Sequence, residues 1–232
     1  KDKLSVQVHP DDSYAAENEN KLGKTEAWII LDAQEDARIV YGVNENVTKE
    51  QLREASLEGA AVESLLRSVP VKKGDAFFIP AGTVHAIGGG IVLYEIQQSS
   101  DVTYRFYDWE RTDAQGNKRQ LHLDQALDVT DVDSRLEATV PHILSLEAGK
   151  GKRELLLACP FFVTERYTDC EDAVLMPDSR RFRMLTAIEK AHIKWDEGML
   201  DLAPGDTVFL PADGYPLKMT GQHLLISYPV KE

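Results

Sequence analysis

The chain contains one short segment twice, and this repeat limits its fold more than any other feature. Residues 71–81 read Val-Lys-Lys-Gly-Asp-Ala-Phe-Phe-Ile-Pro-Ala, and residues 202–212 read Leu-Ala-Pro-Gly-Asp-Thr-Val-Phe-Leu-Pro-Ala in the same register. In both copies a Gly-Asp turn precedes four residues of strand character, and Pro-Ala follows them. The repeat therefore predicts two similar β-barrel units within one chain.

Most of the remaining sequence also has the pattern of short strands. Runs of four to seven residues rich in Val, Ile, Leu, Phe and Tyr are separated by Gly, Pro, Asp and Asn. The clearest predicted strands are residues 4–9, 27–32, 37–41, 76–79, 91–97, 162–167, 207–210 and 224–228. This pattern predicts an all-β fold.

Two segments break the strand pattern. Thr48 and Gln51 have the spacing of a capping box, and apolar residues then recur near the helical period, so we predict a helical insertion over residues 49–68. A second helix is predicted over residues 122–129, because Leu123, Ala126 and Leu127 share one helical face.

The two units are expected to join within residues 134–152, where acidic residues and a Gly-Lys-Gly-Lys run dilute the apolar pattern. We predict a first unit over residues 1–133 and a second over residues 153–232. Because the chain begins at Lys1 and enters a predicted strand within five residues, we expect the first unit to be truncated at its N-terminus.

Composition excludes several classes of function. The chain has 232 residues and a net charge of −13, which disfavours nucleic acid and anionic lipid surfaces as partners. Its longest apolar run, residues 155–163, includes Pro160 and is shorter than the roughly 17–25 residues of a membrane-spanning helix. Cys159 and Cys170 are too few for a disulfide scaffold, so we expect free thiols and a reducing cytoplasm. The oligomeric state has no visible signal.

Four residues of metal-ligand type are placed to meet inside the first unit. Gln7 and His9 are two residues apart on a strand and so point to one face, while Glu26 and His85 come from other strands. Mixed nitrogen and oxygen ligation of this kind suits zinc, manganese, iron or cobalt. The second copy of the repeat has Pro216 in the place of His85, so only the first unit can use this position as a ligand.

One of these motifs resembles a known superfamily. Gly74, Pro80, Gly82 and His85 follow the pattern G-x5-P-x-G-x2-H, which is similar to the second signature motif of the cupins. In the first cupin motif two histidines usually stand one residue apart, and here Gln7 takes the place of the first. The resemblance implies that both units are cupin-like jelly-roll barrels.

Four motifs in order resemble the type I mannose-6-phosphate isomerases in their shorter bacterial form. They are Q-V-H-P-x-D from Gln7, K-T-E-x-W from Lys24, P-x-G-x-x-H-A from Pro80, and residues 95–105, which run from Glu-Ile-Gln-Gln to Thr-Tyr-Arg. Members of that family carry a further N-terminal portion before the first of these motifs. The resemblance implies one zinc ion held by Gln7, His9, Glu26 and His85 in a cytoplasmic enzyme of carbohydrate metabolism.

The resemblance also implies a reaction and its residues. The family interconverts mannose 6-phosphate and fructose 6-phosphate, small sugar phosphates, by moving a proton between C1 and C2 through an enediol. Arg105 resembles the family's active-site arginine, and its planar cation suits an oxyanion or a phosphate. Glu95 is the candidate base or proton relay, and Lys24 is the candidate contact to a substrate oxygen.

Several alternatives stay open at this stage. Gln7 could bind a ligand residue instead of the metal, Lys24 could be a solvated side chain, and Glu95 and Arg105 could form a structural ion pair. The chain could also be a cupin that binds a metal or a sugar phosphate without catalysis. An iron cupin dioxygenase is disfavoured by Gln7, because such sites usually carry three histidines. The remaining histidines, His122, His142, His192 and His223, have no ligand spacing and are expected to be structural.

Overall fold

Both copies of the repeated segment fold into the same turn and strand. In the computed structural model, which describes residues 3–230, the first copy forms β5 (Ala76–Ile79) and the second forms β15 (Thr207–Leu210). The glycine before each strand has a positive φ, 95° at Gly74 and 92° at Gly205, which favours glycine. The aspartate that follows each glycine accepts a backbone N–H from the residue three positions earlier. The Gly-Asp turn is thus the same in both copies.

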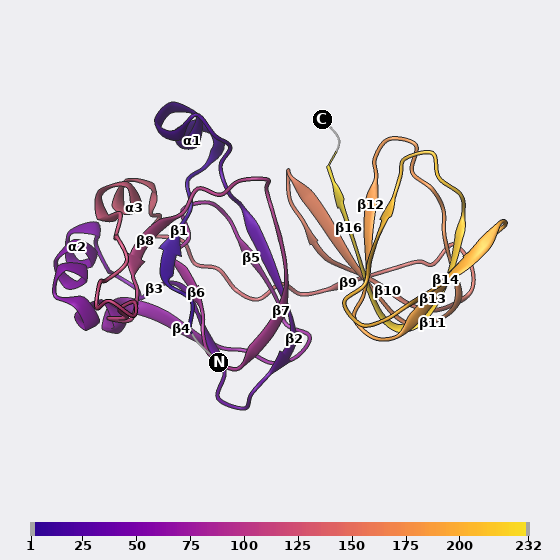
Figure 1. Ribbon diagram of the computed structural model, residues 1–232, viewed down its shortest axis with the longest axis horizontal. Coiled ribbons are helices and arrows are strands. Elements are labelled where there is room, and N and C mark those ends of the chain that lie inside the picture. The colour runs from indigo at the N-terminus through magenta and orange to yellow at the C-terminus, as the bar shows by residue number, and fades with distance from the viewer. Residues whose placement is uncertain (1–2, 231–232) are drawn as a thin grey trace. The chain divides into compact units, whose positions relative to one another are not determined.

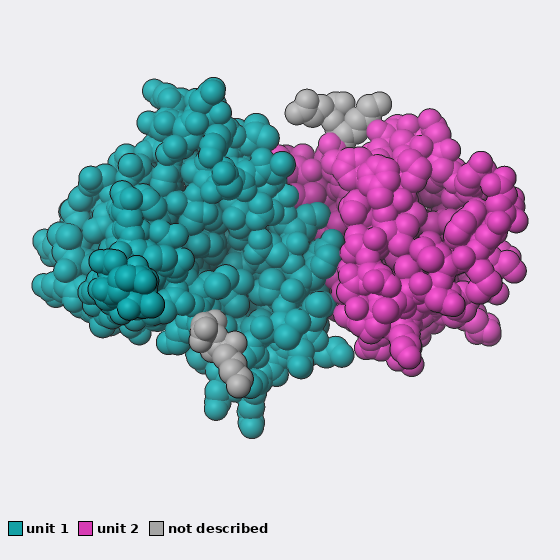
Figure 2. Space-filling view, viewed as in Figure 1, with its two compact units in different colours: residues 1–138 teal, residues 139–232 magenta. Residues whose placement is uncertain are grey.

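The chain divides into two compact units, residues 1–138 and residues 139–232 (Figures 1 and 2). The boundary lies within the expected joining segment, residues 134–152. Both units consist of antiparallel sheets, which confirms the predicted all-β, cupin-like fold. No helix in residues 3–230 is long and apolar enough to cross a membrane.

Unit 1 contains a five-stranded sheet in the order β4-β3-β6-β1-β8 and a three-stranded sheet in the order β5-β2-β7. Besides β5, its elements are β1 (Val6–Val8), α1 (Asp12–Glu19), β2 (Glu26–Ala33), β3 (Arg38–Val43), α2 (Lys49–Leu57), the 3-10 helix η1 (Gly59–Leu65), β4 (Leu66–Pro70), β6 (His85–Ile87), β7 (Ile91–Gln97), β8 (Tyr104–Tyr107) and α3 (Leu123–Val129).

The two faces of the five-stranded sheet have different neighbours. Ile39 and Tyr41 of β3 pack between the sheets against Trp28 of β2. Val40, which points the other way, packs with Leu52 of α2 in a second core cluster beneath the helices. Figure 1 shows α2 and α3 beside this sheet. One face of each strand therefore lines the interior between the sheets, and the opposite face binds the helices.

The predicted helical insertion over residues 49–68 is helical as far as Leu65 but is not one continuous α-helix, and the prediction is wrong for its last three residues. The capping box of Thr48 and Gln51 forms as expected, but α2 ends at Leu57, because Gly59 adopts a φ of 74° that an α-helix does not allow. A 3-10 helix follows, and from Leu66 onward the chain forms β4. The helix predicted over residues 122–129 is present as α3, whereas α1 was not predicted.

Unit 2 consists of one eight-stranded sheet in the order β14-β13-β16-β11-β10-β9, in which β12 pairs with β15 and β16. Besides β15, its strands are β9 (His142–Leu144), β10 (Lys150–Ala158), β11 (Phe162–Leu175), β12 (Arg183–Ala187), β13 (Ala191–Trp195), β14 (Gly198–Leu202) and β16 (Leu217–Pro229). Leu185, Ile193 and Met219 are among its buried core residues. Cys159 and Cys170 are free thiols, as expected.

Candidate metal centre

Strand alternation turns Gln7 toward the interior of unit 1. Its neighbours Val6 and Val8 are fully buried in the cluster beneath the helices, so Gln7 points to the opposite face. Strand β1 lies between β6 and β8, where Gln7 is opposite His85 on one side and opposite Arg105 on the other. Residues opposite each other on antiparallel strands point to the same face. The sheet therefore presents Gln7, His85 and Arg105 to one interior.

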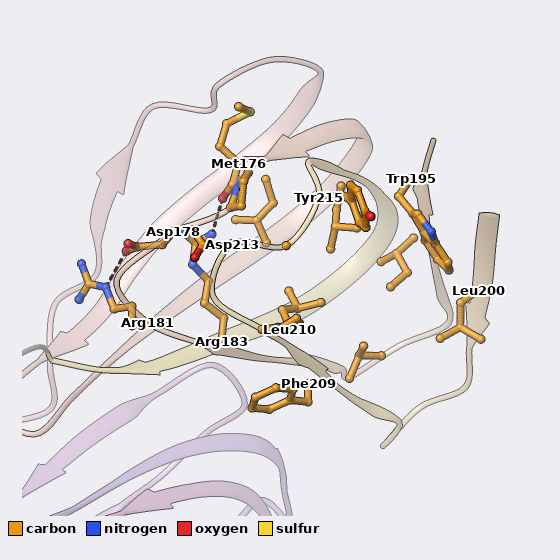
Figure 3. Close-up of a pocket in the computed structure, with 17 residues that line it drawn as sticks. Met176, Asp178, Arg181, Arg183, Trp195, Leu200, Phe209, Leu210, Asp213 and Tyr215 are labelled. Atoms are coloured by element: carbon orange, nitrogen blue, oxygen red, sulfur yellow. Dashed lines mark hydrogen bonds and ion pairs between the residues drawn. The ribbon is translucent and has the colours of Figure 1, made fainter. Parts of the chain in front are cut away.

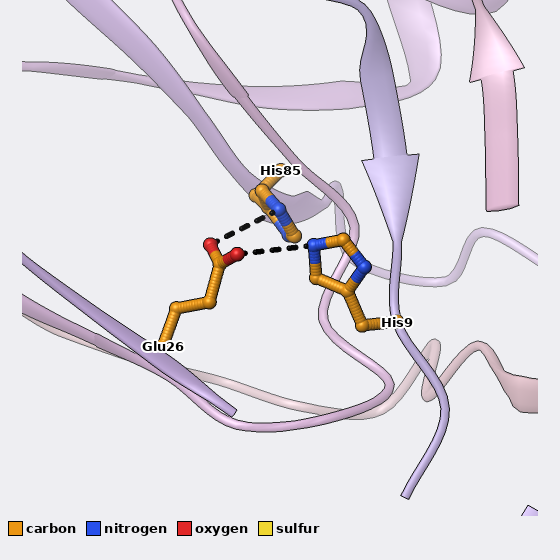
Figure 4. Close-up of side chains that lie close together, drawn as sticks. All are labelled: His9, Glu26 and His85. Atoms are coloured by element: carbon orange, nitrogen blue, oxygen red, sulfur yellow. Dashed lines mark ion pairs between the residues drawn. The ribbon is translucent and has the colours of Figure 1, made fainter. Parts of the chain in front are cut away.

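His9, Glu26 and His85 meet in that interior (Figure 4). Their candidate ligand atoms all lie within 4.8 Å of one another, and each side chain is at most 1% exposed. His9 Nε2 lies 3.2 Å from Glu26 Oε1, and His85 Nε2 lies 3.6 Å from Glu26 Oε2. Glu26 begins β2 in the opposite sheet, while His9 follows β1 and His85 begins β6. Both sheets thus contribute to one buried group.

Backbone carbonyl groups orient both imidazole rings. His9 Nδ1 lies 2.8 Å from the carbonyl oxygen of Val102, and His85 Nδ1 lies 2.8 Å from that of Thr83. Because a carbonyl oxygen only accepts, each Nδ1 must donate its hydrogen, and each neutral ring then carries its lone pair on Nε2. In metal-binding histidines the ring nitrogen that does not bind the metal typically donates its hydrogen to a carbonyl or carboxylate oxygen in this way. The rings therefore direct lone pairs toward Glu26.

This arrangement leaves several buried acceptor atoms close together without hydrogen-bond partners. Among the described residues, His9 Nε2 and both carboxylate oxygens of Glu26 are buried atoms that lack a hydrogen-bond partner. Lys24 Nζ lies 2.8 Å from Glu26 Oε1 and forms an ion pair with it, but the angles at these atoms do not make a hydrogen bond. An unpaired buried polar atom costs about 1–3 kcal/mol. A divalent cation between the lone pairs would satisfy all of them, so these residues fit a bound metal ion.

Gln7 is placed to complete the group. Its side-chain nitrogen lies 3.3 Å from His85 Nε2. Rotation of the amide by half a turn exchanges its nitrogen and oxygen, so Oε1 can take the same position and present a ligand atom.

The electrostatics of the group favour the protonation states that a metal needs. Burial raises the pKa of Glu26, but His9, His85 and Lys24 outweigh it and lower that pKa to about 2. Burial and the neighbouring His9 lower the pKa of His85 to about 4. At neutral pH the group therefore contains a carboxylate and a neutral imidazole, which are the metal-binding forms.

Glu95 joins the site through Trp28. The two residues are opposite each other on β7 and β2, and the Trp28 indole donates a hydrogen bond of 2.9 Å to Glu95 Oε2. Burial and the nearby Glu26 raise the pKa of Glu95, whereas the Trp28 hydrogen bond opposes that rise. A carboxyl group with a raised pKa close to a metal group is suited to taking up and releasing a proton.

Arg105 has an incompletely paired guanidinium. Its Nη1 donates to the carbonyl oxygen of Gln120 at 2.9 Å, while its Nε is buried without a partner. Within residues 3–230 no ion pair joins Arg105 to Glu95, so the structural pair considered from the sequence does not form. His122 has a structural role here, since its Nδ1 accepts the Arg105 backbone N–H.

The sequence predicted that His9, Glu26 and His85 meet in unit 1, as they do, but gave no indication of the groups that orient them. The carbonyl groups of Val102 and Thr83 orient the histidines, and Trp28 orients Glu95. Thr83 lies two residues before His85 inside the P-x-G-x-x-H-A motif, so its contact with His85 is local in the sequence. Nothing in the sequence pairs Val102 with His9, 93 residues away.

Comparisons with known proteins give consistent findings. The chain is 42% identical over 211 residues to mannose-6-phosphate isomerase of Streptococcus mutans, an alignment that covers 90% of this chain and 65% of that protein. It is 40% identical over 230 residues to mannose-6-phosphate isomerase ManA of Bacillus subtilis, covering 99% of this chain and 67% of that protein. This chain therefore spans about two thirds of the length of these relatives. No protein-family model matches it.

Solved structures agree with the fold. The crystal structure of mannose 6-phosphate isomerase from Bacillus subtilis matches with a TM-score of 0.87 at 32% identity, covering 99% of this chain and 72% of that one. A variant of phosphomannose isomerase from Salmonella typhimurium matches with a TM-score of 0.73 at 16% identity, covering 100% of this chain and 77% of that one. At this lower identity the likeness concerns the fold alone.

Proposed function

The chain belongs to the mannose-6-phosphate isomerase family, and on this premise we propose that it interconverts mannose 6-phosphate and fructose 6-phosphate with one bound zinc ion. The observation that carries the proposal is the buried group of His9, Glu26 and His85, in which His9 Nε2 and both carboxylate oxygens of Glu26 lack a hydrogen-bond partner. A chain that retained only the family fold would have no reason to keep these atoms unpaired, given their cost in stability.

Gln7, His9, Glu26 and His85 would hold the zinc ion in unit 1. Two imidazoles, a carboxylate and an amide oxygen are ligands that zinc accepts. When bound, zinc supplies a Lewis acid that polarises substrate oxygens. Unit 2, by contrast, has Pro216 in the place of His85, and we assign the metal chemistry to unit 1 alone.

The reaction moves a proton between C1 and C2, and Glu95 is the residue that we assign to it. As a carboxylate it would take the proton from one carbon, and as a carboxylic acid it would return the proton to the other. Its raised pKa brings these two states closer in free energy near neutral pH. The Trp28 hydrogen bond would fix the orientation of the carboxyl group during both transfers.

Arg105 and Lys24 would bind the substrate. The enediol intermediate carries negative charge on oxygen, and the Arg105 guanidinium, with its unpaired Nε, can donate to that oxygen. The Lys24 side chain is 11% exposed and its ammonium lies beside Glu26, so it can reach a substrate oxygen at the proposed metal site. Both cations would also attract a sugar phosphate to a protein with a net charge of −13. We propose a cytoplasmic location, in keeping with the free thiols.

The test uses the complete reading frame that contains this chain. The purified protein is stripped of metal and reloaded with zinc, and fructose 6-phosphate formation from mannose 6-phosphate is followed by a coupled assay. We expect turnover that depends on zinc, that is absent from His85→Ala, and that is much weaker with glucose 6-phosphate. Tight zinc and sugar-phosphate binding without turnover would refute the isomerase and favour a binding protein.

A further inference from the structure

The repeat locates the counterpart of the metal centre in unit 2. Strand β2 pairs with β5 in the same way that β12 pairs with β15. Glu26 is opposite Ile79, and Arg183 is opposite Leu210. Ile79 and Leu210 hold the same position in the two copies of the repeat. Arg183 therefore occupies in unit 2 the place that Glu26 occupies in unit 1.

The other ligand positions can be followed in the same way. Pro216 takes the place of His85, and Leu175 of β11 is opposite Leu217, the residue after Pro216. Continuing this pairing by one residue places Met176 opposite Pro216, as Gln7 is opposite His85 in unit 1. Asp178, two residues after Met176, then corresponds to His9, two residues after Gln7. A thioether, a carboxylate, a guanidinium and a proline do not form a metal site.

A cavity opens at this position. It has a volume of about 450 Å³, within the usual range for small-molecule sites. Met176, Asp178 and Arg183 line it together with mostly apolar side chains, among them Trp195, Leu200 and Val208. Figure 3 shows Arg183 at one end of the cavity and Trp195 with Leu200 at the other. Unit 2 thus has a pocket with an apolar end and a charged end, where Arg181 and Arg183 lie with Asp178 and Asp213, at the place where unit 1 has the group of His9, Glu26 and His85.

Arg183 differs from its neighbours in its pairing. Arg180 and Arg181 both form ion pairs with Asp178, at 3.2 and 2.7 Å. Arg183 donates from Nη1 to the carbonyl oxygen of Met176 at 2.9 Å, and within residues 3–230 no carboxylate pairs with it. A guanidinium has five N–H donors, so most of the hydrogen-bonding capacity of Arg183 remains available.

We propose that this cavity binds a small organic molecule with a flat apolar body and one carboxylate. The carboxylate would pair with Arg183, because a guanidinium fork matches a planar carboxylate in two parallel hydrogen bonds. The body would lie against Trp195 and Leu200 at the opposite end. A sugar phosphate does not fit this description, since its hydroxyl groups would meet apolar walls and lose hydrogen bonds to water. The site is therefore distinct from the proposed isomerase centre.

The experiment compares 2-naphthoate with its uncharged amide, 2-naphthamide, as probes. Binding is measured by isothermal titration and by ligand-observed NMR on the wild-type protein, on Arg183→Met and on Arg180→Met. Arg180 is a matched control, because it is a neighbouring arginine outside the set of residues that line this cavity. We expect 2-naphthoate to bind at least tenfold more tightly than the amide, Arg183→Met to lose at least tenfold in affinity, and Arg180→Met to lose less than twofold.

A second variant tests the apolar end. Val208→Trp fills the cavity and should abolish binding, while His85→Ala, which acts in unit 1, should leave it unchanged. The proposal is overturned if 2-naphthoate fails to bind at millimolar concentration, if the amide binds as well as the acid, or if Arg180→Met weakens binding as much as Arg183→Met. The unfolding midpoint of each variant shows whether unit 2 remains folded. The comparison of 2-naphthoate with 2-naphthamide uses the wild-type protein and so does not depend on the folding of any variant.

Discussion

Gln7 of β1 and Arg105 of β8 lie directly opposite each other, so their side chains share the interior face of the five-stranded sheet. Gln7 is a proposed zinc ligand, whereas Arg105 is a cation and cannot ligate a metal. Arg105 thus lies one strand away from the metal group without belonging to it. Turnover and metal content should therefore respond separately to substitutions at these positions.

The first prediction concerns this separation. Arg105→Ala should lower kcat by about 100-fold or more, as expected when a donor to a developing oxyanion is removed, and should leave the zinc content at the wild-type level. His85→Ala should lose both zinc and turnover. Elemental analysis of the purified variants and the coupled isomerase assay measure the two properties. Equal loss of zinc in both variants would contradict the assignment of Arg105.

The second prediction follows from the ion pair between Lys24 and Glu26. The Lys24 ammonium lies 2.8 Å from Glu26 Oε1 and so competes with a metal ion for the charge of that oxygen. Lys24→Met should raise zinc affinity severalfold, because one nearby positive charge is removed, yet it should lower turnover by removing a substrate contact. Competition with a fluorescent zinc chelator measures the affinity.

Lys21 provides the matched control for that substitution. It also pairs with a carboxylate, Asp101, but both side chains are largely exposed. Lys21→Met should change neither zinc affinity nor turnover by more than twofold. Weaker zinc binding in Lys24→Met would show that Lys24 organises Glu26 instead of competing for it.

The third prediction uses the hydrogen bond from Trp28 to Glu95. This bond lowers the pKa of Glu95 against the effects of burial and of Glu26. Trp28→Phe removes it, so the pKa of Glu95 should rise further above its ordinary value. If the carboxylate is the active base, the acid limb of the kcat profile should move to higher pH by the same amount while zinc content stays unchanged.

Trp109→Phe is the control for this shift. The Trp109 indole also donates a hydrogen bond, but to the carbonyl oxygen of Leu4. Its loss should leave the acid limb in place. A profile that moves equally in both variants, or in neither, would remove Glu95 from the proton transfer.

The meeting of His9, Glu26 and His85 was predictable from the sequence because local rules determine most of it. Residues two apart on a strand share a face, which brought Gln7 and His9 together, and the turn motif placed His85 at the start of β6. The contacts that orient these residues were not predictable, since the carbonyl of Val102 reaches His9 only through the tertiary fold. Motif spacing carries no information on such backbone contacts.

Helix α1 and the cavity of unit 2 were also not predicted from the sequence. Helix α1 has only Ala15 buried, so it shows little of the apolar periodicity that identifies a helix, although Asp11 caps its N-terminus. The cavity of unit 2 was missed for another reason. The sequence revealed Pro216 in the place of His85, but the match of Arg183 to Glu26 requires the pairing of β12 with β15.

The fourth prediction concerns the stability of unit 2, where Glu165 is buried among donors. This carboxylate is 2% exposed and accepts two hydrogen bonds of 2.8 Å from Arg153, one of 3.0 Å from Tyr167 and one of 2.7 Å from Tyr228. Burial raises the pKa of Glu165, but Arg153 and the tyrosines outweigh it, and the pKa lies below its ordinary value of 4.5.

A lowered pKa in the folded state fixes the sign of the pH dependence. The contribution of Glu165 to stability is fully present above the ordinary pKa and is lost as the pH falls through the lower, folded-state pKa. Glu165→Gln should lower the free energy of unfolding of unit 2 by about 1–3 kcal/mol at pH 7, since it leaves the half-buried Arg153 guanidinium without its charge partner. Urea unfolding at several pH values measures this loss.

The exposed pair of Lys150 and Glu171 supplies the comparison within the same sheet. Glu171→Gln should cost less than about 1 kcal/mol at pH 7 and should keep the wild-type dependence on pH. Between pH 7 and pH 3, Glu165→Gln should lose less stability than the wild type, because the group that titrates with folding is gone. If its stability fell as steeply as that of the wild type, the acid sensitivity of unit 2 would belong to other carboxylates.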